Sequence, residues 1–245
     1  MAALRHRTSG KRILPAFRTL PAPSPNRGIA MRIAAPLSAI ALSLLLITGC
    51  DAGNGLDKVN GSVDVQAGSH VGNASTVNGS IEIGHDATVA SAETVNGEID
   101  LGPHAHANSL ETVNGGIQIE SAAEVVRSAA TVNGSLELAS GSHVGGRLEN
   151  VNGTIKLDHA NVDGGIDTVD GDVTIGSGSI VRTGLHVEKP HGFFVHVSRK
   201  PRIVIASGAT VDGTLQFDRD VDLLVASDAK IGKVVGAKPQ PYNGK

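Results

Sequence analysis

Aliphatic and polar residues alternate in a short unit that is repeated along most of this chain. Its form is that of Val77-Asn78-Gly79-Ser80-Ile81-Glu82-Ile83. The second residue of successive units is Asn60, Asn78, Asn96, Asn114, Asn133, Asn152 and Asp170, and neighbouring units are 18 or 19 residues apart. A fixed period of this length is typical of a solenoid, in which each structural unit stacks on the one before.

Three positions of the repeat carry the apolar residues. Counting from the valine before each Asn-Gly or Asp-Gly pair, the fourth residue on is Val63, Ile81, Ile99, Ile117, Leu136, Ile155 and Val173. The sixth residue on is Val65, Ile83, Leu101, Ile119, Leu138, Leu157 and Ile175. The twelfth is Val71, Val89, Ala107, Val125, Val144, Asp163 and Val181, where the exception, Asp163, has Val162 beside it. Since side chains alternate along a strand, the fourth and sixth residues face inward and the fifth faces outward.

These columns predict an all-β fold, a single-stranded parallel β-helix (β-solenoid) of about nine coils with about 18–19 residues per coil. Each coil contributes about three short strands, and each strand pairs in parallel with the next coil. A helix is disfavoured because Asn-Gly interrupts every repeat. A string of hairpins is the structural alternative, but it leaves the aliphatic twelfth residue unexplained. Right-handed coiling is favoured, because parallel crossovers are nearly always right-handed.

The repeated Asn-Gly pair predicts a corner in every coil. Stacked side chains there can hydrogen-bond along the solenoid, and glycine supplies the positive φ that such a corner requires. The predicted structural ladder consists of Asn60, Asn78, Asn96, Asn114, Asn133, Asn152 and Asp170.

Two stretches carry a resemblance to known families. Thr94-Val95-Asn96-Gly97-Glu98-Ile99-Asp100-Leu101 and Ala209-Thr210-Val211-Asp212-Gly213-Thr214-Leu215-Gln216-Phe217 resemble the bactofilins, polymer-forming proteins built on a right-handed parallel β-helix. They are also similar to putative-adhesin domains made of β-strand repeats in bacteria. The resemblance covers roughly residues 58–235 and implies a structural or adhesive role. Bactofilins are usually cytoplasmic, whereas the first fifty residues of this chain, described below, predict export.

Composition narrows the functional classes. The chain has 31 glycines and only 2% aromatic residues. Residues 1–49 hold seven Arg or Lys and no acidic residue, so the remainder holds 14 basic and 24 acidic residues, a formal charge of -10. Nucleic-acid binding is disfavoured, since it calls for basic grooves and aromatic platforms. A single cysteine leaves no internal disulfide and no cysteine-based zinc cage.

The first fifty residues have the features of an export signal. After Met31, one arginine precedes an apolar run from Ile33 to Ile47, which has the length of a signal-peptide core rather than of a membrane span. Ile47-Thr48-Gly49-Cys50 resembles the lipobox of bacterial lipoproteins, which implies that Cys50 is lipidated and becomes the mature N-terminus. The alternative is an ordinary cleaved signal with a chance cysteine. Asp51 resembles a sorting signal for retention in the inner membrane, and the choice between inner and outer membrane stays open.

Residues 185–201 depart from the repeat and are interpreted as a loop or hairpin excursion. The segment contains two prolines, three histidines and the pair Phe193 and Phe194. That pair is a possible partner contact, or it folds back as a cap on the stack. The repeat resumes after it, and the prolines of the tail are expected to blunt the last edge strand.

An enzyme is the main functional alternative. Apolar residues at positions zero, six and twelve also fit the hexapeptide-repeat acyltransferases, but those use cytosolic acyl donors and the histidines here form no column. His104 and His106 are interpreted as surface residues rather than metal ligands. The outward fifth residues, Asp64, Glu82, Asp100, Gln118, Glu137, Lys156 and Thr174, are interpreted as a solvated face whose carboxylates could attract divalent cations. We therefore expect no catalytic residues, no metal site and no cofactor.

The predicted organisation is as follows. Residues 1–30 are predicted to be an upstream extension from a mis-assigned start, 31–49 the lipoprotein signal peptide, and 50–57 the lipid anchor and linker. The coils occupy 58–184 and 202–236 around the excursion at 185–201, and 237–245 is a tail.

The predicted function is a non-enzymatic scaffold or adhesin-like module, lipid-anchored in the bacterial cell envelope and facing the periplasm. Its expected partners are the membrane, through Cys50, and other envelope proteins or further copies of itself. The alternatives are a hexapeptide-type transferase and a polymer-forming, bactofilin-like cytoskeletal protein.

Overall fold

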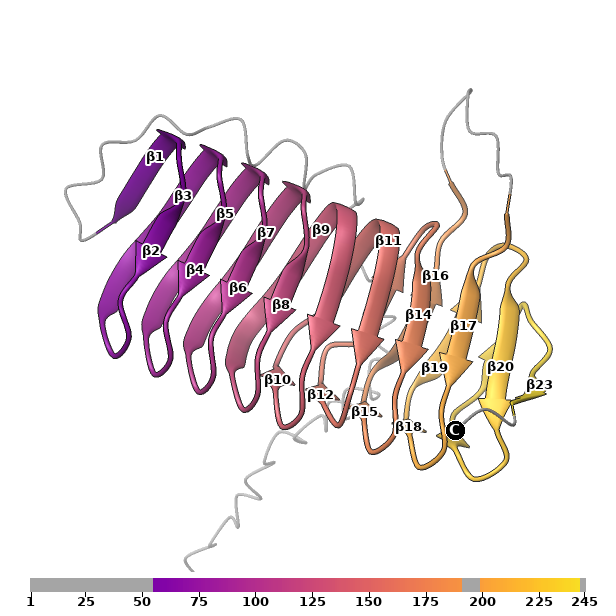
Figure 1. Cartoon of the computed structure of the whole chain (residues 1–245). Helices are drawn as coiled ribbons and strands as arrows, with labels where there is room; N and C mark the ends of the chain where they lie inside the picture. The colour runs from indigo at the N-terminus through magenta and orange to yellow at the C-terminus, as the bar shows by residue number, and fades with distance from the viewer. Residues whose placement is uncertain (1–54, 191–198, 243–245) are drawn as a thin grey trace, which may run out of the picture. The chain divides into compact units, whose positions relative to one another are not determined.

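The computed structural model describes residues 55–190 and 199–242, and within them every regular element is a β-strand. Their strands pair in parallel and stack as a β-solenoid of about ten turns, with about 18 residues per turn (Figure 1). The predicted fold class is confirmed, and the string of hairpins is wrong because neighbouring strands along the stack run parallel rather than antiparallel.

The described residues form 23 strands, which follow in chain order. They are β1 (Leu56–Asn60), β2 (Val63–Val65), β3 (His70–Asn78), β4 (Ile81–Ile83), β5 (Thr88–Asn96), β6 (Ile99–Leu101), β7 (His106–Asn114), β8 (Ile117–Ile119), β9 (Glu124–Leu138), β10 (His143–Val144), β11 (Leu148–Leu157) and β12 (Asn161–Val162). The others are β13 (Ile166–Thr168), β14 (Asp172–Ile175), β15 (Ile180–Val181), β16 (Gly184–Val187), β17 (Arg202–Ile205), β18 (Thr210–Val211), β19 (Thr214–Phe217), β20 (Asp222–Ala226), β21 (Lys230–Ile231), β22 (Val234–Val235) and β23 (Gln240–Tyr242).

The strands line up in three columns along the stack. One column contains β2, β4, β6 and β8 and continues through β14, β17 and β20. A second runs through β10, β12, β15, β18 and β21, and a third through β13, β16, β19 and β22. Long strands such as β9 turn corners and belong to more than one column, since β9 pairs with β8, β10 and β11.

The predicted inward positions form the core. The fourth and sixth residues of all seven units are at most 2% exposed. The twelfth residue is buried from Val89 to Val144 and again at Val181, while Val71 packs partly buried against the core. At the single exception Val162 is buried and pairs with Val144, so it takes the place of Asp163. The valine that precedes each Asn-Gly pair is only partly buried and, at Val59, exposed, so the buried pattern is not the hexapeptide one.

Glycine meets two different requirements at the Asn-Gly corners. Gly61 and Gly153 have the predicted positive φ, at 100° and 131°, whereas other corners require glycine for a different reason. A Cβ on Gly97 would lie 1.9 Å from the carbonyl oxygen of Gly79, and one on Gly115 would lie 1.8 Å from that of Gly97. Neither residue has a positive φ. At these two corners the backbone of one coil approaches the preceding coil too closely for any side chain, so close approach rather than left-handed geometry requires glycine.

Another turn of each coil does use left-handed geometry. Gly68, Asp86, His104, Ala122, Gly141, His159, Gly178 and Gly208 occupy corresponding places in successive coils, with φ between 50° and 79°. In most of these turns the residue after the left-handed one donates a hydrogen bond to a carbonyl three residues earlier, as Ala105 does to Gly102 at 3.1 Å. Four coils therefore place a side chain in a conformation that favours glycine.

The stack reaches further toward the C-terminus than predicted. Gln240–Tyr242, expected to be an irregular tail, forms β23 and pairs in parallel with β20. Pro241 is tolerated there because β23 is an edge strand, where an amide hydrogen facing away from the stack has no partner to lose. This additional strand is the reason for about ten turns instead of nine.

The insertion is shorter than predicted. Leu185 and Val187 are buried in β16, which pairs with β13 and β19, so the repeat continues to residue 187. It resumes at Arg202, and Val173 pairs with Ile203, 30 residues later, in place of the usual 18 or 19. Residues 188–201 thus replace the corner that is Val169-Asp170-Gly171 in the preceding coil.

Candidate functional site

The asparagine corners stack as a continuous ladder. Nδ2 of Asn78 donates to Oδ1 of Asn60 at 3.1 Å, and the same bond joins Asn96 to Asn78 and Asn114 to Asn96 at 3.0 Å. Asn133 donates to Asn114 at 3.1 Å, and Asn152 to Asn133 at 3.4 Å. The side chains are exposed, so the ladder lies on the surface of the stack.

A second ladder lies just inside the first, and sequence reasoning missed it. The residue before each valine is a buried threonine at 76, 94, 112 and 131. The hydroxyl of each donates at 3.0 Å to the carbonyl oxygen of a corner glycine, as Thr112 does to Gly97. Asn150 takes this place in the next coil and donates through Nδ2 to Gly134 at 3.0 Å. The repeated sequence Thr-Val-Asn-Gly could have indicated this ladder, because it places a polar threonine at an inward position.

Asp170, predicted as the last member of the ladder, does not join it by any hydrogen bond found among the described residues. An ionised carboxylate has no proton to donate, so it cannot continue the donor-to-acceptor series toward Asn152. Instead its Oδ1 accepts a hydrogen bond from Nη1 of Arg219 at 3.0 Å. The ladder therefore ends at Asn152.

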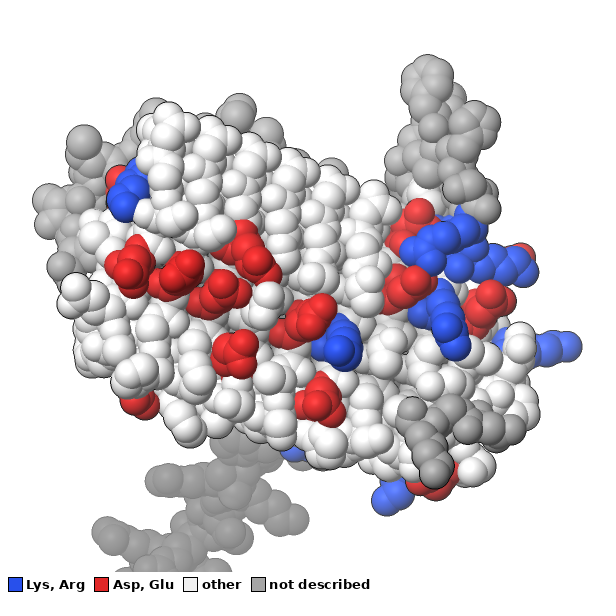
Figure 2. Space-filling view, in the orientation of Figure 1, with Lys and Arg blue, Asp and Glu red and all other residues white. Residues whose placement is uncertain are grey.

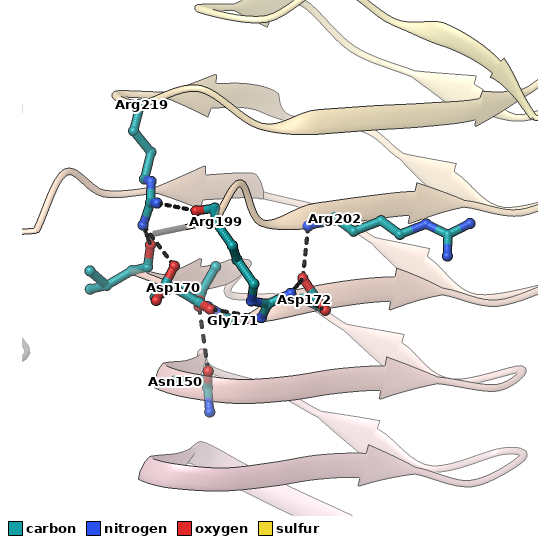
Figure 3. A network of polar contacts seen from close by, with 9 residues as sticks. Asn150, Asp170, Gly171, Asp172, Arg199, Arg202 and Arg219 are labelled. Atoms are coloured by element: carbon teal, nitrogen blue, oxygen red, sulfur yellow. Dashed lines mark hydrogen bonds and ion pairs between the residues drawn. The ribbon is translucent and has the colours of Figure 1, made fainter. Parts of the chain in front are cut away.

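Arginines close the corner beside the insertion (Figure 3). Arg219 comes from the corner that follows the insertion, and its side chain is only 6% exposed. Besides Asp170 it donates to the carbonyl oxygens of Val169 at 2.9 Å and Arg199 at 2.8 Å. Arg219 thus reaches across the coil whose corner the insertion replaces and ties together the coils on either side.

The C-terminal stem of the insertion is held by Asp172. Both carboxylate oxygens of Asp172 accept from Nη1 of Arg199, at 2.9 and 2.8 Å, and Oδ1 also accepts from the backbone amide of Arg202 at 2.7 Å. This pairing raises the pKa of Arg199 above its ordinary value, first through the hydrogen bond and then through the charge of Asp172. The side chain of Arg202 points away from the cluster (Figure 3).

Carboxylates line the outer face of the column that contains β2, β4, β6 and β8. Asp64 pairs with Glu82, and Glu82 with Asp100, so the predicted outward residues stand side by side. Figure 2 shows acidic residues in a row across this face. Burial, followed by the charges of Glu98, Glu82 and Glu120, raises the pKa of Asp100. Oδ1 of Asp100 is buried and has no hydrogen-bond partner, while Gln118 donates to Glu98 at 2.6 Å.

The third column begins with β3, β5 and β7 and continues through β9 and β11 to β13 and β16, and it carries a different outward row. Burial is the main cause that raises the pKa of Glu93, and Glu111 adds to it. Burial likewise raises the pKa of Glu149, with Asp167 as the next cause. Farther along, Asp167 forms an ion pair with Arg147, and Nε2 of His186 lies 2.8 Å from Asp218. Toward the C-terminus, basic groups that pair with the carboxylates thus join this row.

The histidines are dispersed among surface contacts. His104 occupies a left-handed turn, and Nδ1 of His106 lies 3.2 Å from Glu124. His143 lies 3.1 Å from Asp163 and, with Arg182, lowers the pKa of that carboxyl group. No group of three or more candidate metal ligands occurs in residues 55–190 and 199–242.

One depression of about 180 Å³ lies between neighbouring coils and is lined by Gln118, Ile119, Glu120, Glu137, Leu138, Ala139, Lys156 and Asp158. It adjoins the carboxylate row described above. Across the described residues, no helix has the length and apolar character of a membrane span.

Four predicted site residues lie outside the described residues. These are the lipidation site Cys50, the sorting residue Asp51, and the possible contact residues Phe193 and Phe194. Their roles stay predictions from the sequence.

Comparison of the chain with family models, with curated proteins and with solved structures finds no match.

Proposed function

We propose that this chain is a lipid-anchored protein of the bacterial cell envelope whose β-solenoid serves as a non-enzymatic structural or interaction module. The lipobox-like Ile47-Thr48-Gly49-Cys50 after an apolar run supports the anchor. The stacking of about ten turns supports the structural role, because such a stack presents long outer faces on which a partner can be held.

The structural role rests on one observation: the inward, corner and outward positions of each coil carry different kinds of residue. Inward positions are filled by aliphatic residues and buried threonines, and corner positions by the asparagine ladder. Outward positions change their chemistry along the stack, from Asp64 and Glu82 to Lys156 and Thr174. Stability is thereby separated from surface character, as in repeat proteins whose variable outer residues choose the partner.

The anchor is tested by Cys50→Ser in the full chain, expressed in a bacterium fed a radiolabelled fatty acid. We expect the wild type to carry the label and to sediment with membranes. The variant should carry no label and should be unprocessed or soluble. Thr48→Ala is the matched control, because it keeps a small residue beside the cleavage point, and it should behave as the wild type does.

The interaction role requires a separate measurement. Membranes holding the wild type are crosslinked and solubilised, and the captured proteins are compared with those of a variant in which Asp64, Glu82 and Asp100 are changed to the corresponding amides. Loss of a specific captured protein, with folding and anchoring unchanged, supports an interaction module that uses this face. Membrane association without any specific partner on either protein, or turnover of an acyl donor by the purified chain, would contradict the proposal.

A further inference from the structure

The chain has eight Asn-Gly pairs, and six of them lie at the corners of the stack, where the fold controls their reactivity. In such a pair the backbone nitrogen of glycine can attack Cγ of the asparagine side chain, since glycine has no Cβ to hinder the approach. A bond forms between this nitrogen and Cγ, the bond from Cγ to the amide nitrogen breaks, and ammonia leaves with the glycine proton. Water then opens the cyclic imide to aspartate or isoaspartate.

The inner corners hold both reacting groups. The side-chain amides of Asn78, Asn96 and Asn114 each donate one ladder bond and accept another, at 3.0 or 3.1 Å. The attacking nitrogens are also engaged, since the amide of Gly97 donates to the carbonyl oxygen of Asn114 at 3.1 Å, and the amides of Gly79 and Gly115 make the same bond at 3.0 Å. Attack at these corners requires the hydrogen bonds that hold the asparagine side chain and the glycine amide along the stack to break.

The corner at Asn152 differs in each of these respects. Its ladder bond to Asn133 is the longest of the series at 3.4 Å, and the next coil offers Asp170, which has no proton to donate. Asn152, Gly153 and Thr154 are all exposed, whereas the glycines at 79, 97, 115 and 134 are partly buried. β11 pairs with the following coil through β13 at Leu148–Asn150 and again through β14 from Thr154, so the corner itself lies between the two paired stretches.

We infer that Asn152-Gly153, at the C-terminal end of the ladder, is a site of spontaneous deamidation in the folded protein, while the corners at Asn78, Asn96 and Asn114 are protected. Asn60, in the first described coil, and Asn133, which accepts the 3.4 Å bond from Asn152, are left out of the comparison. Deamidation at residue 152 adds a negative charge one coil away from Asp170. As isoaspartate it also lengthens the backbone at that corner.

The full chain, purified in detergent, is incubated in mildly alkaline buffer, and peptide mass spectrometry with isoaspartate detection follows each site over time. We expect residue 152 to react at least about tenfold faster than residues 78, 96 and 114. In denatured protein the difference should vanish, because all these sites share the Asn-Gly sequence. Equal rates in the folded protein, or faster reaction at an inner corner, would overturn the inference.

Two variants separate the ladder's effect from simple exposure. Asn152→Gln should remove the signal at residue 152 and leave the inner rates unchanged. Asp170→Asn provides an amide that can donate to Oδ1 of Asn152, so it should slow reaction at 152 and move the fastest site to residue 170, which Gly171 follows. Circular dichroism confirms that this variant is folded. An unchanged rate at 152 in the folded variant would show that the end of the ladder does not govern the site.

Discussion

At the scale of single residues, neighbouring side chains on one strand lie in opposite environments, one buried in the core and the next facing outward. Ile99 is fully buried between Ile81 and Ile117, with which it pairs along the column, while Asp100 faces outward between Glu82 and Gln118. The stack repeats this arrangement from coil to coil, so a substitution at one inward position also disturbs the packing of the coils above and below it.

Ile99→Asp should therefore be strongly destabilising. It places a carboxylate without a partner between two isoleucines, and we expect a loss of more than about 3 kcal/mol in the free energy of unfolding. Urea denaturation followed by circular dichroism measures this loss. Asp100→Asn on the outward side is the matched control at the same neutral pH, and it should cause no loss of stability, because it removes a charge from among like charges. Equal losses in the two variants would contradict the register.

The column of left-handed turns allows a gain in stability. Ala122 has a φ of 56°, which costs a residue with a Cβ about 1–2 kcal/mol. Ala122→Gly should therefore raise the midpoint of thermal unfolding. Gly141→Ala, in the corresponding turn of the next coil, should lower it by a similar amount, since an added Cβ meets nothing closer than 3.6 Å and only the backbone is strained. A fall in stability on Ala122→Gly would show that the turn is not strained at this residue.

The repeat period determines which residues could be assigned from the sequence alone. The inward positions recur with aliphatic residues, so Ile81 and Ile99 could be assigned to the core without a structure. Thr94 could not, because a polar residue is expected outside unless its hydrogen-bond partner is known, and that partner, Gly79, belongs to the preceding coil. The role of glycine at residue 97 was hidden for the same reason, since the atom that a side chain would strike also belongs to that coil.

At the scale of elements, the insertion between β16 and β17 leaves a corner that Arg219 fills. Its guanidinium group is buried and binds two backbone carbonyl oxygens and the Asp170 carboxylate. The sequence shows an irregular segment here but gives no sign of this bridge, because Asp170 and Arg219 are 49 residues apart. Aspartate in place of asparagine at residue 170 was the only local departure from the repeat.

Arg219→Met should cost about 2–4 kcal/mol of stability, because it leaves the Asp170 carboxylate and two carbonyl oxygens without their donor. Arg202→Met is the matched control, since the Arg202 side chain points away from the cluster and only its backbone amide binds Asp172. That change should have an effect within about 0.5 kcal/mol. Chemical denaturation of both variants distinguishes a bridge from a surface contact, and equal effects would argue against the bridge.

The carboxylate row over β2, β4, β6 and β8 predicts a dependence of stability on pH. Asp100 has a raised pKa in the folded protein, so the folded state holds its proton more tightly than the unfolded state does. Stability contributed by this group is therefore present at low pH and is lost as the pH rises from about the ordinary value of 3.8 through the raised one. Asp100→Asn should unfold at a higher temperature than the wild type at neutral pH, with the difference shrinking in acid. A difference that grows in acid would show the opposite sign.

At the scale of the whole solenoid, the two ends are not equivalent. At one end, among the described residues, β1 and β2 pair only with the coil that follows, through β3 and β4. At the other end β23 covers β20, and Pro241 within it offers no amide hydrogen to a further strand. Proline in an edge strand is a common means of preventing the addition of another chain. The prolines at residues 239 and 241, predicted to blunt the last strand, thus belong to the stack itself or adjoin it.

Removal of β23 should promote association of the chain with itself. A Cys50→Ser variant that ends after Gly236 exposes the edge of β20, whose backbone groups would then be free to pair with β1 or β2 of a second copy. Sedimentation and electron microscopy should show end-to-end oligomers of this variant. The matched control ends after Tyr242 and keeps β23, so it should stay monomeric.

In the lipidated chain, at most seven residues separate Cys50 from residue 58, a reach of about 25 Å. The membrane then crowds the first coil, so lipidated protein should form lateral clusters or remain monomeric. Long filaments of the full lipidated chain, unchanged by the truncation, would contradict this and favour a cytoskeletal polymer.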